Sequence, residues 1–400
     1  MELLIDEAGG GVRAAVAALQ AKIESGVNIT DVSVQHLGYH LHREGGDTLW
    51  EVLFDQLGSL PLLRFDLSLR GYIVSTRALL QTLRRTTESL ESLTISDALF
   101  DGDINELSNA LQEHPSLKIF SLWNCRVLRG EAIQASLMHA LSTCRQLEGV
   151  SLRSVAPFMS RTQLGPSMRQ LCMSPNLQKL ILIDFDISGD WTLVDIFECL
   201  KSSTSLTTFE ARNNFKPMGK NGIEALGRVL TENSTLEDLF ITAENTSLRP
   251  MATALKTNRT LKHLRVDTLR RLPEDEADLF LDVLQENHVL EGLKINASPT
   301  HTSAMQFYSK LNTLGYGRLL NGAADNEWLD VILSNANDVS TAFFLLSKNP
   351  KLCQRALSSK ALTKTRKRSR HLFSPGQSTA LLQRALSSVG IQRPAKRQRR

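Results

Sequence analysis

The chain has 400 residues, of which 42% are hydrophobic and 22% charged, and these fractions are typical of folded globular proteins. No apolar run approaches the roughly 18 residues of a membrane-spanning helix, so the sequence predicts no membrane partner. The net charge of +4 hides an asymmetry, because 13 of the 46 Lys and Arg residues and none of the 42 Asp and Glu residues lie at positions 355–400. The sequence therefore predicts an acidic body and a strongly basic tail.

Cysteine usage and the first residues indicate the cellular compartment. The N-terminal stretch MELLIDEAGGG is acidic, and its apolar run Leu3–Ile5 is too short for a signal peptide. The five cysteines are odd in number and contain no C-x-x-C pair, which predicts free thiols in a reducing compartment. We therefore expect an intracellular protein of the nucleus, the cytoplasm or both. The cysteines are Cys125, Cys144, Cys172, Cys199 and Cys353.

Residues 1–58 predict an N-terminal capping region. Helical spacing of apolar residues occurs at Val12–Ile23 and Thr48–Leu57. Between them, Ile29-x-x-Val32-x-Val34 is a degenerate first copy of a pattern that recurs downstream. A solenoid needs such a covered first repeat, since the exposed end of a stacked core has no neighbour.

The pattern L-x-x-[LFV]-x-[LIVA] recurs nine times between residues 62 and 295, with successive copies beginning 25 to 30 residues apart. In the copy that begins at Leu236, the residues Leu236, Leu239 and Ile241 predict a short strand with one buried face. The helical spacing of Ile223, Leu226 and Val229–Leu230 before it predicts one helix per unit. Such units are stable only when stacked. The first leucines are Leu62, Leu90, Leu117, Leu147, Leu177, Leu206, Leu236, Leu261 and Leu290.

A small or polar residue usually stands three positions before each first leucine, where the helix must end. The helix must turn into the strand there, and asparagine in particular tolerates the left-handed conformation that a helix C-terminus favours. These residues are Ser59, Thr87, His114, Cys144, Ser174, Ser203, Asn233, Asn258 and Asn287.

The copy at Asn213–Ile241, NNFKPMGKNGIEALGRVLTENSTLEDLFI, resembles the repeat of ribonuclease-inhibitor-like (RNI-like) leucine-rich-repeat proteins, and the resemblance covers about residues 29–296. It implies an α/β fold over residues 59–299: a right-handed solenoid, or horseshoe, of about ten units with a parallel concave sheet and convex helices. The asparagine expected two residues after the last apolar strand position occurs only at Asn124 and Asn213. Other copies carry a different residue at this position, and this departure from the family pattern predicts irregular loops on the convex turns. These residues are Asp97, Ser154, Asp184 and Thr268.

The sequence predicts a binding site on the concave face of the sheet. Since strand side chains alternate, the third, fifth and seventh residues of each copy point away from the core. Aromatic, aliphatic and arginine side chains gather there in neighbouring copies, and these types dominate protein-binding hot spots. The alternative is a face that packs only on itself. The predicted protein-binding residues are Trp123, Arg153, Ile181, Ile183, Arg212, Phe240 and Arg265.

After Asn296 the strand pattern stops. Helical stretches follow at Ser303–Leu314, Glu327–Ala336 and Val339–Ser347, ending at Asn349-Pro350, so residues 300–353 predict a helical C-terminal cap.

Residues 354–400 predict a disordered basic tail, because they offer too few apolar groups to order themselves. Its two clusters, KTRKRSR and RPAKRQRR, indicate a nuclear import signal that an import receptor would bind. Sequence-independent contact with nucleic-acid phosphates, or a merely solvated tail, are the alternatives. The predicted import residues are Lys364, Arg366, Lys367, Arg368, Arg370, Lys396, Arg397, Arg399 and Arg400; candidate phosphorylation sites are Ser358, Ser374 and Ser387.

No catalytic, cofactor-binding or metal site is predicted. His36, His40 and His42 lie near Glu44 but lack a known ligand spacing, and the glycines at 9–11 and the GKNG at 219–222 do not form a phosphate-binding loop. We therefore expect a non-enzymatic scaffold that binds a protein ligand. The alternatives are a GTPase-activating regulator of the Ran type, since that leucine-rich-repeat family shares the repeat length, and a nucleic-acid-associated adaptor that acts through the tail.

Overall fold

The computed structural model describes residues 2–5, 11–35, 46–74, 76–86, 88–100, 104–127, 133–154, 161–184, 190–212, 218–244, 246–335, 337–349 and 352. The chain divides into two compact units, Met1–Met305 and Gln306–Arg400. The predicted import and phosphorylation residues of the tail, and the three histidines near Glu44, lie outside the described residues.

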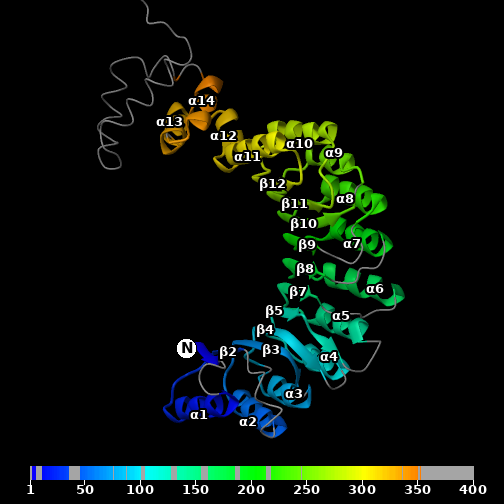
Figure 1. Ribbon diagram of the computed structural model, residues 1–400, viewed down its shortest axis with the longest axis vertical. Coiled ribbons are helices and arrows are strands. Elements are labelled where there is room, and N and C mark those ends of the chain that lie inside the picture. The colour runs from blue at the N-terminus through cyan, green and yellow to red at the C-terminus, as the bar shows by residue number, and fades with distance from the viewer. Residues whose placement is uncertain are drawn as a thin grey trace, which may run out of the picture. The chain divides into compact units, whose positions relative to one another are not determined.

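A single parallel sheet runs through the first unit. Eleven of the strands in the described residues pair with one another in chain order. The remaining described strand, β6, pairs with β4. Within this unit the strands line the inner side and the helices lie outside them (Figure 1). The strands are β1 (Glu2–Ile5), β2 (Asp31–Gln35), β3 (Arg64–Val74), β4 (Ser92–Phe100), β5 (Ile119–Trp123), β6 (Arg126–Val127), β7 (Gly149–Arg153), β8 (Lys179–Ile183), β9 (Thr208–Arg212), β10 (Asp238–Ala243), β11 (His263–Thr268) and β12 (Gly292–Ile295).

One helix precedes nearly every strand, which confirms the predicted alternation. The fold is a leucine-rich-repeat solenoid. Each amphipathic helix lays its apolar stripe against the sheet and its neighbours. The helices of this unit are α1 (Gly11–Glu24), α2 (Gly46–Gly58), α3 (Thr76–Arg85), α4 (Ile104–Gln112), α5 (Ile133–Thr143), α6 (Arg161–Cys172), α7 (Asp190–Ser202), α8 (Lys220–Glu232), α9 (Arg249–Leu255) and α10 (Glu274–Glu286).

The recurring leucines form one buried spine. All nine first leucines of the pattern are at most 2% exposed, and the fourth and sixth residues of each copy are buried beside them. The strand register is continuous, so equivalent residues of successive copies stand opposite one another from β3 to β12. Because each spine residue is covered mainly by its counterparts in adjacent repeats, the core extends along the sheet.

The N-terminal segment contains a strand that was not predicted. β1 pairs in parallel with β2, with Leu3 opposite Val32. The apolar run Leu3–Ile5 therefore extends the sheet by one strand beyond the degenerate first repeat. Four residues are too short a run for a periodicity test, which explains the omission.

At several helix-to-strand junctions a side chain, rather than a left-handed residue, fixes the turn. Asn233 and Asn287 have φ of −73° and −96°, so they do not adopt the left-handed conformation. Instead the Asn258 amide donates to the Leu230 carbonyl of the preceding repeat (2.8 Å), and its Oδ1 accepts the Leu261 N–H (2.8 Å). Equivalent bonds to the preceding repeat join Asn233 to Leu200 (2.6 Å), Asn287 to Leu255 (2.7 Å) and Cys144 to Leu111 (3.3 Å).

Among the described residues, the non-glycine residues with a left-handed backbone lie near the other end of the strands. Asp97, Asn124, Ser154 and Asp184 have φ between 48° and 54°. The backbone N–H of the last three donates to the carbonyl of the seventh pattern residue in the next repeat, at 2.7 to 3.0 Å. These four residues therefore share one conformation, which Asp and Asn adopt at low cost. Residues 101–103, 155–160 and 185–189 of the loops that follow lie outside the described residues, so the expected irregular loops stay a prediction there.

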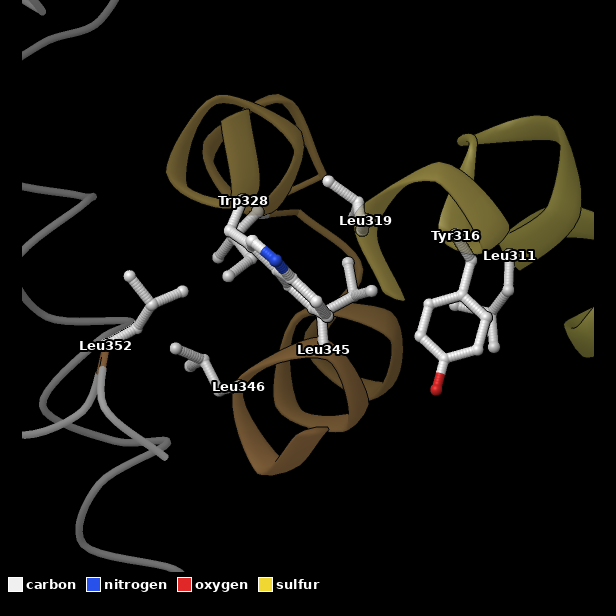
Figure 2. Packing of buried hydrophobic residues seen from close by; sticks show 8 residues of the cluster. Leu311, Tyr316, Leu319, Trp328, Leu345, Leu346 and Leu352 are labelled. Carbon is white, nitrogen blue, oxygen red and sulfur yellow. The ribbon is translucent and has the colours of Figure 1, made fainter. Parts of the chain in front are cut away.

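The second unit is a small helical cluster. Its helices include the end of α11 (Pro299–Thr313), α12 (Tyr316–Leu320), α13 (Asp325–Ser334) and α14 (Val339–Lys348); α12 was not predicted. Asp338 caps α14, where Oδ1 accepts the Thr341 N–H (3.1 Å) and Oδ2 accepts the Lys310 ammonium (2.7 Å). The Lys310 bond, above all, holds the pKa of Asp338 well below its usual range. Figure 2 shows the core, which comprises Leu311, Tyr316, Leu319, Trp328, Ile332, Leu345, Leu346 and Leu352.

Candidate protein-binding face

Three rows of side chains cross the sheet on the side opposite the helices. The register aligns the third, fifth and seventh residues of successive copies, as the alternation predicts. In the seventh row, Trp123, Arg153 and Ile183 stand directly opposite one another on β5, β7 and β8. In the third row, Ile119, Gly149 and Lys179 do the same.

The two rows form an apolar–cationic patch over β5, β7 and β8, made of Ile119, Trp123, Arg153, Lys179 and Ile183. Ile119 is 46% exposed and Trp123 is 41% exposed. The Arg153 guanidinium lies over the indole of Trp123, with Cζ 4.6 Å from the ring centroid. Stacking fixes the arginine while leaving its N–H edge available, which suits recognition of a partner.

Over β5, β7 and β8 the fifth row lies lower than its flanks. Ser121 and Ser151 are 7% and 8% exposed, and Ile181 is only 4% exposed. A side chain in this row is surrounded by the rows on both sides and by its neighbours on adjacent strands. Ile181, one of the predicted binding residues, therefore lies on this face but offers almost no surface to a partner.

Over β9 to β11 the same face carries paired charges. The Glu210 carboxylate, 6% exposed, accepts the Arg212 guanidinium. Arg265 Nε donates to Asp267 Oδ1 (2.9 Å), and Asp267 also lies 3.9 Å from Arg212. Arg212 and Arg265, both predicted binding residues, are thus neutralised within the sheet, and Phe240 stands half-buried between them on β10.

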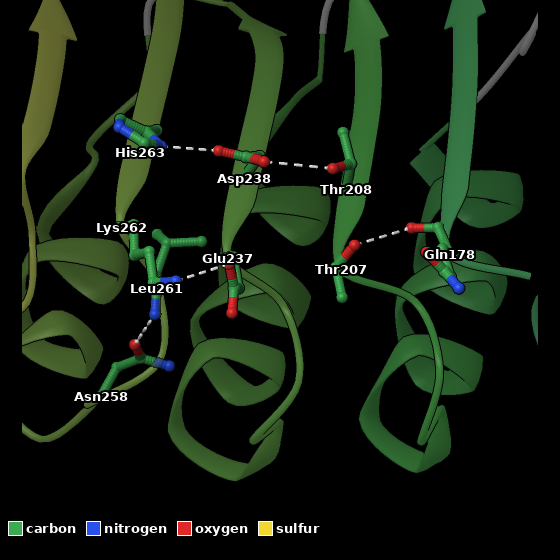
Figure 3. Close-up of polar contacts among 9 residues, drawn as sticks. All are labelled: Gln178, Thr207, Thr208, Glu237, Asp238, Asn258, Leu261, Lys262 and His263. Carbon is green, nitrogen blue, oxygen red and sulfur yellow. Dashed lines mark hydrogen bonds and ion pairs between the residues drawn. The ribbon is translucent and has the colours of Figure 1, made fainter. Parts of the chain in front are cut away.

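A polar row marks the beginnings of the strands, as Figure 3 shows for β8 to β11. Asp238 accepts a hydrogen bond from Thr208 Oγ1 (3.1 Å) on one side and contacts His263 Nδ1 (2.7 Å) on the other. Lys262 pairs with Glu237 (2.7 Å), and this bond raises the pKa of Lys262. The exposed pairs align neighbouring repeats but contribute little stability individually.

Sequence reasoning missed two members of the patch, Ile119 and Lys179. Both occupy the third position of their copies, which alternation already placed on the concave face. The signal that could have found them is the third row itself, where Ile119 is the one large apolar residue between Arg64 and Gly292. The other predicted binding residues lie on this face as expected from the pattern.

The described residues contain no group of three or more His, Cys, Asp or Glu side chains placed to hold a metal ion. In the GKNG stretch, Gly219 is the N-cap of α8 and the next three residues form its first turn. Cys125, Cys144, Cys172 and Cys199 are buried free thiols. Burial raises the pKa of Cys125 to about 12 and that of Cys144 to about 11, which disfavours the nucleophilic thiolate.

None of the described helices has the combination of length and hydropathy needed to cross a lipid bilayer. No protein-family model matches the sequence, and no curated protein matches it. Among solved structures, 72 chains match. One is the leiomodin-1 actin-binding site 2, at 18% identity and a TM-score of 0.34, over 42% of this chain and 97% of that chain. A similarity of this size supports no inference about function.

Proposed function

We propose that the chain is a non-enzymatic scaffold of the RNI-like type that binds a protein ligand on the concave face of its sheet. The exposed, stacked Trp123–Arg153 pair is the observation that supports this most directly. Tryptophan and arginine dominate protein-binding hot spots, and an indole left 41% exposed gains from burial under a partner.

The test uses affinity capture with quantitative comparison of variants. Trp123→Ala and Phe240→Ala truncate the face, and Met173→Ala is the matched control, because Met173 is 50% exposed but lies after α6, outside the concave rows. We expect proteins that are retained by the wild-type chain and by Met173→Ala to be lost from the two concave variants. A loss of affinity of about 30-fold per hot-spot residue is the expected size. Equal retention by all variants would contradict the proposal.

We also propose that the basic tail directs the chain to the nucleus. Two clusters of Lys and Arg within residues 364–370 and 393–400, in a stretch without acidic residues, support this proposal. Phosphorylation at Ser358, Ser374 or Ser387 would reduce the local positive charge and weaken receptor binding. We further propose that residues 300–353 act as the C-terminal cap of the solenoid.

A further inference from the structure

We propose that the apolar–cationic patch binds a protein segment in which an Asp or Glu side chain stands beside an apolar one, and that this carboxylate pairs with Arg153. The inference rests on the proposed concave-face function and specifies the chemistry of the ligand. It concerns the described residues of β5, β7 and β8.

The contacts that Arg153 makes with other described residues do not neutralise its charge. Its Cζ lies over Trp123, and Nε donates to Ser151 Oγ at 3.3 Å. Among the residues that the structure describes, no carboxylate forms an ion pair with it. A half-buried guanidinium held flat on an indole presents its remaining N–H groups in a fixed plane, which matches the geometry of a carboxylate.

The other two arginines of the face behave differently. Arg212 is paired with Glu210, and Arg265 is paired with Asp267. Within the described residues, the sheet therefore places a carboxylate beside Arg212 and beside Arg265, but none beside Arg153. Lys179, exposed in the third row, is a second cation for which the described residues offer no ion pair.

The apolar part of the patch determines which residues of the ligand flank its Asp or Glu. Ile119 and Trp123 lie at the two ends of β5, four residues and so about 13 Å apart, while β5 and β8 are separated by about 10 Å. A few residues of extended chain span this area. An apolar side chain on either side of the acidic residue would then cover Ile119, Trp123 or Ile183.

A phosphate backbone fits the face less well than a single carboxylate. A nucleic acid that continued along the sheet would meet Glu210, Asp238 and Asp267 on β9 to β11. The chain before residue 355 also has fewer basic than acidic residues. Sequence-independent binding of a polyanion requires many unopposed cations, and the patch offers two.

The experiment selects phage-displayed random linear peptides on the full-length chain. We expect enriched peptides to share an Asp or Glu next to Leu, Ile, Phe or Trp. Changing that carboxylate to the amide in a synthetic peptide should weaken binding about 10- to 100-fold, and Arg153→Gln should weaken the parent peptide equally. The double change should cost no more than either single change, since both remove one interaction.

Arg228→Gln is the matched control, because Arg228 lies on α8, outside the concave rows, and is paired with Glu198; it should leave the affinity for the peptide within about twofold. Circular dichroism of each variant verifies the fold. Acidic peptides that bind Arg153→Gln as tightly as the wild type would overturn the inference, as would a library without acidic enrichment. Oligothymidylate that competes for the patch in an Arg153-dependent way would overturn it in favour of nucleic acid. The proposed concave-face function is tested separately by capture and would survive these outcomes.

Discussion

The residue three positions before each first leucine shows how one side chain can hold two repeats together. An asparagine there both donates to the previous repeat and accepts from its own strand, as at Asn258. His114 occupies the same position, 1% exposed, but neither Nδ1 nor Nε2 has a hydrogen-bond partner within the described residues. Its ring approaches the Leu83 carbonyl without reaching hydrogen-bonding geometry. Burial, as the main cause, lowers the pKa of His114 from its ordinary value of 6.5.

The buried histidine predicts a pH dependence of stability. Because the pKa of His114 is lower in the folded state, the unfolded chain binds a proton more readily as the pH falls below 6.5, and stability is lost from there downward. The slope approaches about 1.4 kcal/mol per pH unit at most. We expect the wild-type midpoint of thermal unfolding to fall more than that of His114→Asn between about pH 7.5 and 5.5. Parallel midpoints over this range would contradict the assignment, since other histidines are common to both chains.

At the scale of the element, periodicity predicts the strands and helices that recur in many copies, and it misses short elements that occur once. The strands from Leu62 to Ile295 were predicted because each apolar position is repeated in nine copies. β1 and α12, of four and five residues, are too short for such averaging. The pattern does not show which asparagines are left-handed, because asparagine serves both as a left-handed residue, at Asn124, and as a bridging side chain, at Asn258.

The site followed the same rule. Which positions face outward was predictable from alternation, and the register confirms it. Which of them offer surface was not, since exposure depends on neighbours from other repeats. Ile181 is covered, whereas Ile119 is 46% exposed. By contrast, Arg212 pairs with Glu210 and Arg265 with Asp267 two residues away on the same strand, whereas Ser151 stands two residues before Arg153, so this difference is contained within single copies of the pattern.

The bridging asparagines predict a large effect from a single truncation. Asn258→Ala leaves the Leu230 carbonyl and the Leu261 N–H buried without their partner, and also removes the acceptor of the half-buried Thr260 N–H, so we expect a loss of about 2–4 kcal/mol in the free energy of unfolding. Asn296→Ala, at an exposed residue directly after β12, should change the free energy of unfolding by less than about 0.5 kcal/mol. Denaturant titration measures both. Equal effects of the two substitutions would show that the bridge between repeats does not hold them together.

At the scale of the whole molecule, charge separates the chain into regions with different tasks. In the described body, several arginines pair with carboxylates within the sheet or between helices, as Arg228 does with Glu198 at 3.4 Å. The segment after residue 354 has 13 basic residues and no acidic one, so its charge is available to an external acidic partner. Binding on the concave face and targeting by the tail should therefore be separable.

Removal of residues 360–400 tests this separation. We expect a fluorescent fusion of the truncated chain to lose nuclear enrichment, because both basic clusters that an import receptor would contact are deleted. Replacement of Lys396, Arg397, Arg399 and Arg400 by Ala in the full chain shows whether nuclear enrichment requires the second cluster. The truncated chain should keep its affinity for concave-face ligands within about twofold, since the deleted residues contribute none of the side chains of the concave rows. Undiminished nuclear enrichment of the truncated fusion would refute the targeting role, and loss of ligand affinity would show that the tail takes part in binding.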